Sequence, residues 1–312
     1  MVDDKALESL QLFFFRVSLV REQVGEFLAC PVCRSPLKFE GKRGTGRFLR
    51  GYFTCNLSHV FQVKQEIGLF KDAKMSAHEF EWKINVADQS KYDEIRKQYD
   101  SYLREDQKCA MQKTKDRLVN YVVESCADPN CAVLDVATGM GTFILDLAEG
   151  CSRDALLVGT DIDERPLRGA LNRARKASVY DRLSFIVTDA KHLCFGKGSL
   201  LTVSSYFGFD NVPETSLAFK ETARVLGDGG RLFFSSLWLK ENSDSIRLAE
   251  KHNVCQIASE ERLNKALERA GLVRDFVEEI YSGVWPHNPM DLLPVEGDQY
   301  SHVIVHARKT RG

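Results

Sequence analysis

The sequence predicts an α/β fold in which helices cover both faces of a parallel sheet. Short apolar runs alternate with helical patterns over residues 131–312, and several of these runs end in a glycine or an acid just before a helix. Hydrophobic residues make up 44% and charged residues 28% of the 312-residue chain, which is globular usage. Apolar strands that alternate with helices form parallel sheets, and such sheets bind ligands at the carboxyl ends of their strands.

Seven apolar runs are the expected strands. They span residues 132–137, 156–160, 183–187, 200–204, 231–235, 273–280 and 302–307. We expect helices over 142–149 and 164–178, and one opened by Pro213, since proline is favoured at the first helical position. A further helix over 259–270 has Ser259 as its expected N-cap and Gly271 at its C-terminal end.

Composition divides the chain into three segments. Residues 1–72 are expected to hold an N-terminal helix and a zinc ribbon, 73–130 a helical connector or lid, and 131–312 the α/β domain. The apolar stretch from Leu12 to Val20 is interrupted by Arg16 and preceded by Asp3 and Asp4, which predicts an amphipathic helix on the protein body, not a signal peptide. No run of 18 apolar residues occurs, so we expect no membrane span.

Charge and cysteine usage narrow the function classes. Lys and Arg total 43 against 44 Asp and Glu, a net charge of −1 that excludes a globally basic nucleic-acid-coating protein but allows a local basic patch. Six of the nine cysteines are scattered, which predicts a reducing, cytoplasmic environment. The sequence carries no signal for an oligomeric state.

A glycine-containing turn follows the first expected strand. The run VLDVATGMG (residues 133–141) passes from strand into helix and contains an acid, Asp135. Glycines there let the backbone reverse tightly and let a ligand approach closely. With two glycines the run is not the GxGxxG turn of dinucleotide binding, and alone it is equally well explained as an ordinary strand–helix turn.

Acids also stand at the ends of the next two strands. Asp161 lies 20 residues after Gly141, and Asp189 follows the third strand. A carboxylate at the tip of the second strand suits a ribose diol, because two hydroxyls can donate to its two oxygens. The acid after the third strand can accept the amino group of an adenine. Helix capping explains each acid singly, but it explains three acids and a glycine turn at successive strand ends less well.

This segment resembles the class I S-adenosylmethionine (SAM)-dependent methyltransferases. Residues 135–141 match the family's first motif, with Ala137 where the first glycine usually stands, a variant that resembles the quinone-type C-methyltransferase branch. Asp161 matches the ribose-binding acid and Asp189 the acid near the adenine, while residues 221–230 resemble the helix and turn before the fifth strand. The family's usual acid at the start of the fourth strand is replaced by Gly198-Ser199, so no catalytic carboxylate is expected there.

The resemblance implies a seven-stranded Rossmann-like methyltransferase sheet, SAM as the cofactor, and in-line methyl transfer that depends chiefly on positioning. It implies the following cofactor-binding residues: Asp135, Ala137, Thr138, Gly139, Gly141, Asp161, Ile162, Asp189, Ala190 and Ser204.

Residues after the fourth strand are expected to face the methyl acceptor. The candidates are Ser205, Tyr206, Phe207, Asp210 and Asn211, with His287 and Tyr300 as further ones. Tyr206 or Asp210 could act as a base if the acceptor is poorly nucleophilic, or they could simply line the pocket or pack.

A metal site is predicted near the N-terminus. Cys30 and Cys33 form a CxxC pair, and Cys55 with His59 follows after 21 intervening residues. Two close ligand pairs at this separation suit a tetrahedral zinc ion, and four protein ligands predict a structural site. The segment resembles the small zinc modules of some methyltransferases, including the ribosomal RNA guanine-N1 enzymes.

The loop between the two ligand pairs is basic and aromatic. Six cations stand against one acid, Glu40, and four aromatic rings lie between them. The cations are Arg34, Lys38, Lys42, Arg43, Arg47 and Arg50, and the rings are Phe39, Phe48, Tyr52 and Phe53. Cations for phosphates and rings for stacking suit RNA, whereas a solvated loop with ordinary core aromatics is the simpler explanation.

Three functions follow from these patterns. The first is a SAM-dependent methyltransferase of a small molecule, with the ribbon and the connector forming a lid. The second is an RNA base methyltransferase (rRNA or tRNA) that grips RNA with its zinc ribbon. The third is a non-catalytic SAM-fold binding module, which the intact Asp135, Gly139, Gly141 and Asp161 disfavour.

Overall fold

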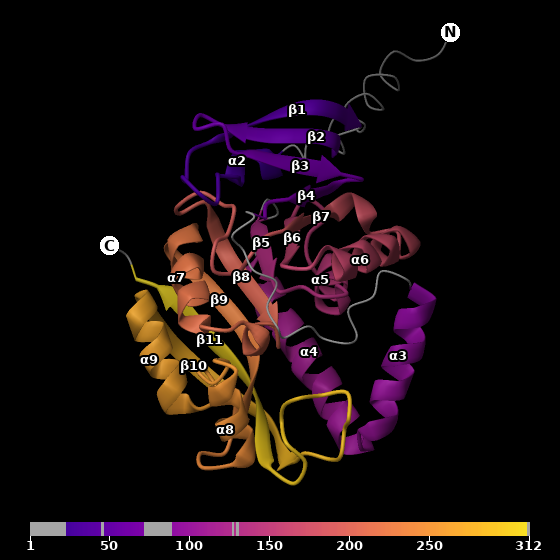
Figure 1. Ribbon diagram of the computed structural model, residues 1–312, viewed down its shortest axis with the longest axis vertical. Coiled ribbons are helices and arrows are strands. Elements are labelled where there is room, and N and C mark those ends of the chain that lie inside the picture. The colour runs from indigo at the N-terminus through magenta and orange to yellow at the C-terminus, as the bar shows by residue number, and fades with distance from the viewer. Residues whose placement is uncertain (1–22, 45–46, 72–88, 127, 129–130, 311–312) are drawn as a thin grey trace.

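The computed structural model describes residues 23–44, 47–71, 89–126, 128 and 131–310 (Figure 1). The expected amphipathic helix over Leu12–Val20 and the connector residues 73–88 lie outside the described residues. No helix of the described part is long and apolar enough to cross a bilayer.

Seven strands form the core of the sheet, and they confirm the seven apolar runs. They are β5 (Ala132–Val136), β6 (Leu156–Asp161), β7 (Leu183–Val187), β8 (Leu200–Tyr206), β9 (Leu226–Leu239), β10 (Leu272–Val284) and β11 (Gln299–Lys309). Their order across the sheet is β7-β6-β5-β8-β9-β11-β10. The first five run parallel, and β11 is antiparallel to both of its neighbours. The carboxyl ends of β5, β6, β7 and β8 therefore meet at one edge.

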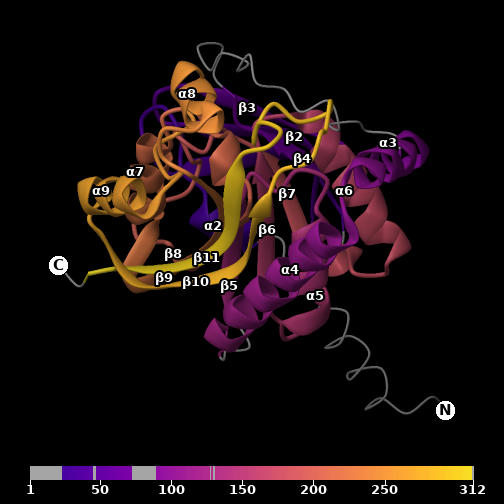
Figure 2. The same ribbon diagram turned by 90° about the horizontal axis from the view of Figure 1, so that it is seen from below.

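Helices cover both faces of this sheet (Figure 2). One face packs against α4 (Glu105–Ser125), α5 (Thr142–Gly150) and α6 (Glu164–Lys176), and the other against α7 (Thr215–Val225) and α9 (Glu260–Ala270). Alternate residues along each strand serve the two cores: Val133 and Leu157 face α4 to α6, whereas Leu134 and Val158 face α7 and α9.

Two further helices lie beyond these layers. Helix α3 (Gln89–Tyr102) lies beside α6, where the Arg173 guanidinium stacks on the Tyr92 ring, and α8 (Asp244–Lys251) follows β9. Helix α9 ends at Gly271 in the left-handed conformation, as expected. Ser259 stands at its N-cap, but its hydroxyl donates to Glu241 and not to the helix backbone.

The expectation that Pro213 opens a helix is wrong by two residues. Glu214 adopts a left-handed conformation (φ 56°), so the chain turns after Pro213 and α7 begins at Thr215. The Thr215 hydroxyl, which donates to the carbonyl of Val212 at 2.7 Å, fixes this turn.

The expected seven-stranded sheet is also corrected, because the described residues form one sheet of eleven strands. After the short α2 (Val24–Phe27), the N-terminal segment adds β1 (Leu37–Gly44), β2 (Arg47–Cys55), β3 (Val60–Lys64) and β4 (Ile67–Leu69). Strand β4 pairs in parallel with β7, and the Phe70 amide donates to the Val187 carbonyl at 2.8 Å. This pairing satisfies backbone groups that would otherwise lie unpaired at the β7 edge.

Polar contacts join this N-terminal module (residues 23–71) to the main domain. The Arg47 side chain pairs with Glu66 at 2.8 Å, donates to the Tyr180 carbonyl at 2.6 Å and lies on the Tyr180 ring. Arg34 pairs with Glu221 at 3.1 Å on the opposite face. The module is therefore fixed to the sheet at two separate points.

Candidate functional site

The turn after β5 leaves an open space above its backbone. Ala137 and Gly139 both have a φ of 55°, and Gly141 has a φ of 77°. A methyl group on Gly139 would meet no atom within 4 Å, whereas one on Gly141 would lie 2.7 Å from the Ala170 Cβ. Gly141 thus permits close packing of α5 on α6, while Gly139 borders free space.

Asp161, at the end of β6, is held by backbone donors. Its Oδ2 accepts a hydrogen bond from the Gly139 amide at 2.9 Å, and its Oδ1 accepts one from the Asp163 amide at 3.0 Å. Burial raises the pKa of this carboxyl above its usual range. Asp189, after β7, accepts the Lys191 amide at 2.8 Å, so both acids have fixed orientations.

Asp135 lies beneath the turn, at the end of β5. Its carboxylate accepts hydrogen bonds from the Thr138 hydroxyl at 2.8 Å and from the Ser204 hydroxyl of β8 at 3.0 Å. Burial raises the pKa of Asp135 to about 7. This carboxyl therefore ties the turn to the neighbouring strand.

These elements enclose a cavity of about 260 Å³, which we call the turn cavity. Of the ten predicted cofactor residues, Gly141 and Ser204 stand behind its wall. The other eight line it: Asp135, Ala137, Thr138, Gly139, Asp161, Ile162, Asp189 and Ala190.

Residues of the connector complete the turn cavity, and sequence reasoning missed them. Tyr92, Arg96 and Tyr99 come from α3 and Met111 from α4. Two of them are tyrosines seven residues apart on a polar helix, which places them on one face. That spacing was the available signal, although it predicts a packed face as readily as a binding one.

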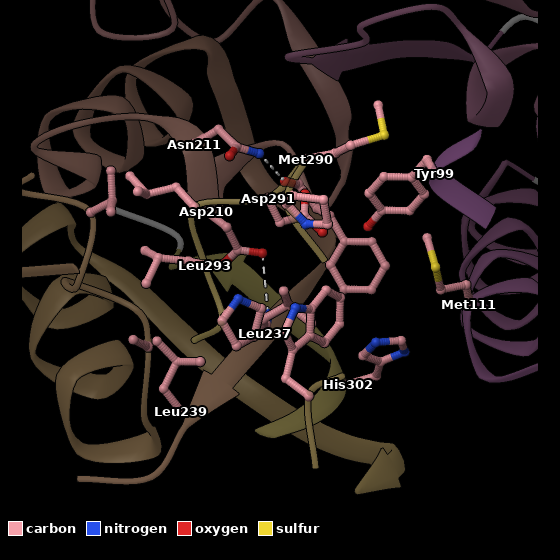
Figure 3. Close-up of a pocket in the computed structure, with 17 residues that line it drawn as sticks. Tyr99, Met111, Asp210, Asn211, Leu237, Leu239, Met290, Asp291, Leu293 and His302 are labelled. Carbon is pink, nitrogen blue, oxygen red and sulfur yellow. Dashed lines mark hydrogen bonds between the residues drawn. The ribbon is translucent and has the colours of Figure 1, made fainter. Parts of the chain in front are cut away.

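A second cavity of about 390 Å³ adjoins the first, and we call it the distal cavity (Figure 3). Both cavities share Tyr99, Met111, Phe207 and Asn211 in their walls. The remaining wall is mostly apolar, and it comes from β9, β11, the residues after β8 and β10, and the segment between α8 and α9. It comprises Asp210, Leu237, Leu239, Val254, Ala258, Trp285, Pro289, Met290, Asp291, Leu292, Leu293, Pro294 and His302.

The predicted acceptor-side residues surround the junction, but their polar atoms are already engaged. The Tyr206 hydroxyl donates to the Met111 carbonyl at 2.9 Å, and the Asn211 amide donates to the Phe207 carbonyl at 3.0 Å. Asp210 is buried and accepts hydrogen bonds from the Ser236 hydroxyl at 2.6 Å and from a backbone amide at 3.1 Å. Burial raises the pKa of Asp210 to about 7.

The other three candidates do not line either cavity. The Ser205 hydroxyl donates to the Val136 carbonyl within the sheet, and His287 contacts Glu296 at the surface. Tyr300 is buried and its hydroxyl accepts a hydrogen bond from Gln107 at 3.0 Å. Their contacts in the structure are those of packing and surface residues.

The four predicted metal ligands come together in the N-terminal module. The ligand atoms of Cys30, Cys33, Cys55 and His59 all lie within 4.8 Å of one another. The Cys55 Sγ lies 3.2 Å from the His59 Nδ1 and 3.6 Å from the Cys33 Sγ. This cluster is a possible metal site.

The basic loop is partly used within the fold. Arg34 and Arg47 form the two junctions described above, and the Arg43 guanidinium lies over the Phe39 and Phe48 rings. Lys38, Lys42 and Arg50 are exposed. Half of the six cations therefore make contacts within the fold, and of these three only Arg47 is buried.

The family model described as "ubiE/COQ5 methyltransferase family" matches residues 88–244. The chain is 38% identical over 105 residues to a ubiquinone/menaquinone biosynthesis C-methyltransferase, UbiE, of Rhizobium rhizogenes, covering 34% of this chain and 41% of that protein. It is 28% identical over 146 residues to the methyltransferase GfsG of Streptomyces halstedii, covering 45% of this chain and 52% of that protein. The chain thus spans about two fifths to one half of these relatives.

Solved structures share the fold. The [4+2]-cyclase SpnF aligns with a TM-score of 0.52 and 21% identity, covering 63% of this chain and 81% of that one. Geranyl diphosphate C-methyltransferase from Streptomyces coelicolor, solved with Mg²⁺, geranyl diphosphate and S-adenosylhomocysteine, aligns with a TM-score of 0.50 and 16% identity, covering 62% and 77%. Because a cyclase and a methyltransferase both match, the fold alone does not fix the reaction.

Proposed function

The chain belongs to the ubiE/COQ5 methyltransferase family, and we propose that it transfers the methyl group of SAM to a small-molecule acceptor. The turn cavity takes the cofactor, and the distal cavity takes the acceptor. The observation that carries this proposal is their shared wall of Tyr99, Met111, Phe207 and Asn211, because a methyl group must pass between two directly adjoining sites.

The cofactor residues along the sheet edge each contact a different part of SAM. Asp161 accepts the ribose hydroxyls, and the Gly139 amide that it binds keeps its carboxylate at the mouth of the turn. Asp189 lies beside the adenine. The open space above Gly139 admits the methionine part of SAM, and buried Asp135 holds the turn in place.

SAM binding tests this assignment directly. Isothermal titration with S-adenosylhomocysteine should show binding to the wild type and about 10- to 100-fold weaker binding to Asp161→Asn, because a charge-assisted pair with the ribose is lost. Asp163→Asn, which alters the N-cap of α6, is the matched control and should retain affinity. Absence of binding to the wild type contradicts the proposal.

Methyl transfer is tested separately from binding. A methyl-label transfer assay against extracted metabolites and total RNA should label a small molecule. A labelled RNA would instead support an RNA methyltransferase. The observation that favours this alternative is the exposure of Lys38, Lys42 and Arg50. Binding of SAM with no labelled product would favour a non-catalytic module.

We also propose that Cys30, Cys33, Cys55 and His59 hold a structural zinc ion. Bond lengths of 2.0–2.3 Å in a tetrahedral site place ligand atoms about 3.5–3.8 Å apart, close to the 3.5 Å between Cys30 Sγ and His59 Nδ1. The Cys33 and His59 amides point at the Cys30 and Cys55 sulfurs, at 3.5 and 3.4 Å, and so stabilise thiolates. When bound, zinc would hold the Cys30–Cys33 turn to the turn between β2 and β3; it supplies no chemistry to the cavities.

Metal removal tests the zinc proposal. The purified protein should contain one zinc per chain, and a chelator should lower its melting temperature, because the binding free energy of a structural zinc is folding free energy. Cys30→Ser removes one ligand and should lower the melting temperature in the same way. The control is Cys109→Ser, at an exposed cysteine outside the cluster. Protein without stoichiometric zinc would rule the site out.

The cellular setting is a further part of the proposal. None of the nine cysteines is in a disulfide, which supports a reducing, cytoplasmic environment.

A further inference from the structure

We propose that Arg96, on α3, binds the carboxylate in the methionine part of SAM. This role rests on the proposed function, and it belongs to a residue that the sequence did not indicate as part of the site. At neutral pH SAM carries a positive sulfonium, a positive ammonium and one negative carboxylate. A carboxylate that leaves water for the turn cavity needs a partner of opposite charge there.

The wall of the turn cavity holds three acids and one cation. The acids are Asp135, Asp161 and Asp189, and Arg96 is the single Lys or Arg among the described residues of that wall. Carboxylates suit the hydroxyls, the amino group and the positive charges of SAM, but they repel its carboxylate. The Arg96 guanidinium is therefore the charged group in this wall that complements the carboxylate.

The N–H donors of Arg96 are within reach of a ligand. Its side chain keeps 38% of its surface exposed, and its Nε lies 3.0 Å from the Asp100 Oδ1, one turn further along α3. This ion pair is not aligned as a hydrogen bond, because the Asp100 Oδ1 has no hydrogen-bond partner among the described residues. The planar guanidinium can therefore present two parallel N–H donors to a carboxylate.

Arg96 stands toward the end of the turn cavity where the methionine part is expected. The carboxyl ends of the strands follow the order β7-β6-β5-β8, with Asp189 after β7 and Asp161 at the end of β6. Because the proposed adenine and ribose positions lie there, the methionine part extends toward β5 and β8, through the open space above Gly139. The Arg96 guanidinium is within electrostatic range of Tyr206, the last residue of β8. Its charge thus lies away from the adenine end.

The position of Arg96 favours the cofactor over the acceptor as its partner. Arg96 lines the turn cavity, whereas the described wall of the distal cavity contains no Lys or Arg. The Arg96 guanidinium lies over the ring of Tyr99, 5.3 Å from its centroid, and buried Tyr99 belongs to the wall that both cavities share. A SAM carboxylate bound to Arg96 would therefore hold α3 against the junction of the two cavities.

Two ligands that differ only in the carboxylate test this role. S-adenosylhomocysteine and its decarboxylated analogue, in which a hydrogen atom replaces the carboxylate, are titrated calorimetrically into the full-length protein. The wild type should bind S-adenosylhomocysteine about tenfold more tightly or better, because the analogue cannot pair with the guanidinium. Arg96→Gln should lose most of this preference, while its affinity for the analogue and its melting temperature stay at the wild-type values.

Two further variants separate the charge of Arg96 from its shape and place. Lys97→Gln removes a positive charge at the next, exposed position of α3 and should keep the full preference for S-adenosylhomocysteine. Arg96→Lys keeps the charge without the planar fork and should keep part of that preference.

The ratio of the two dissociation constants decides the outcome. An unchanged ratio in Arg96→Gln overturns the role of Arg96. An equal loss of affinity for both ligands also overturns it, because that result indicates a packing role alone. Failure of S-adenosylhomocysteine to bind the wild type would instead overturn the proposed function.

Discussion

At the scale of single residues, Gly208 shows how closely the turn after β5 is packed against the chain that follows β8. A Cβ atom on Gly208 would lie 2.5 Å from the Ser205 Oγ, 2.7 Å from the Ala137 Cβ and 2.9 Å from the Val136 carbonyl oxygen. Ala137 stands where the resembled family usually has glycine, so its methyl group occupies space that only a glycine at position 208 leaves free.

Gly208→Ala should therefore destabilise the protein by about 1–3 kcal/mol, the usual cost of overpacking. It should also weaken S-adenosylhomocysteine binding, because Gly208 and Ala137 both line the turn cavity. Urea unfolding and titration calorimetry measure the two effects. Gly196→Ala, where a Cβ would have no neighbour closer than 3.7 Å, is the control and should be nearly neutral. Equal stabilities for the two variants would contradict this account.

At this scale, sequence reasoning could locate residues of the turn cavity where a residue type and a local motif coincide. Asp135, Gly139 and Asp161 could be found because each stands at a strand end that the apolar pattern marks. Tyr99 and Asp291 could not, because they meet only through tertiary contacts between α3 and a segment almost two hundred residues later. The same holds for Tyr206 and Asp210, whose positions were predicted but whose hydrogen bonds depend on distant partners.

At the scale of elements, the strands of the N-terminal module are part of the main sheet and do not form a separate sheet. Strand β4 has only three residues, and its partner β7 begins at Leu183, so no local pattern could predict the pairing. The seven core strands could be predicted because each is a buried run of apolar residues flanked by a helix. Arg47 shows the same limit. The basic sequence around it suggested a surface cation, but the fold buries it to 7% exposure.

Replacement of Arg47 by Met should cost about 3–5 kcal/mol of stability, because it leaves the Glu66 carboxylate in a largely buried position without its main partner. Arg50→Met, three residues along the same strand and exposed, is the control and should change stability by less than about 0.5 kcal/mol. Chemical denaturation of both variants gives the comparison. If Arg47→Met and Arg50→Met lost the same free energy of unfolding, the Arg47–Glu66 contact would not contribute measurably to stability.

At the scale of the whole molecule, buried carboxyls make stability depend on pH. Asp135 and Asp210 have pKa values raised to about 7 by burial, against an unfolded value near 3.8. Well below pH 3.8 both carboxyls are protonated in the folded and unfolded states and contribute nothing to the pH dependence. Between pH 4 and 7 the unfolded chain releases these protons and the folded protein keeps them, so stability falls as pH rises and levels off above pH 7.

Asp210→Asn should remove the contribution of Asp210 to this loss of stability with rising pH, because asparagine resembles the protonated acid at every pH. We expect the variant to exceed the wild type by about 1 kcal/mol at pH 4.5 and by about 2–4 kcal/mol at pH 8. Urea unfolding across this range measures the difference. Exposed Asp154→Asn should keep the wild-type slope. Parallel curves for the wild type and Asp210→Asn would show that Asp210 is ionised in the folded state.

The β4–β7 pairing has a consequence for how the protein behaves among other copies of itself. By extending the sheet it moves the free margin from apolar β7 to β1, whose exposed positions include Lys38, Glu40 and Lys42. The opposite margin, β10, carries acids of its own at Glu278 and Glu279. Charged margins resist the addition of a strand from a neighbouring molecule. The three residues of β4 thus cover the edge of an apolar core strand and leave a charged strand at the margin in its place.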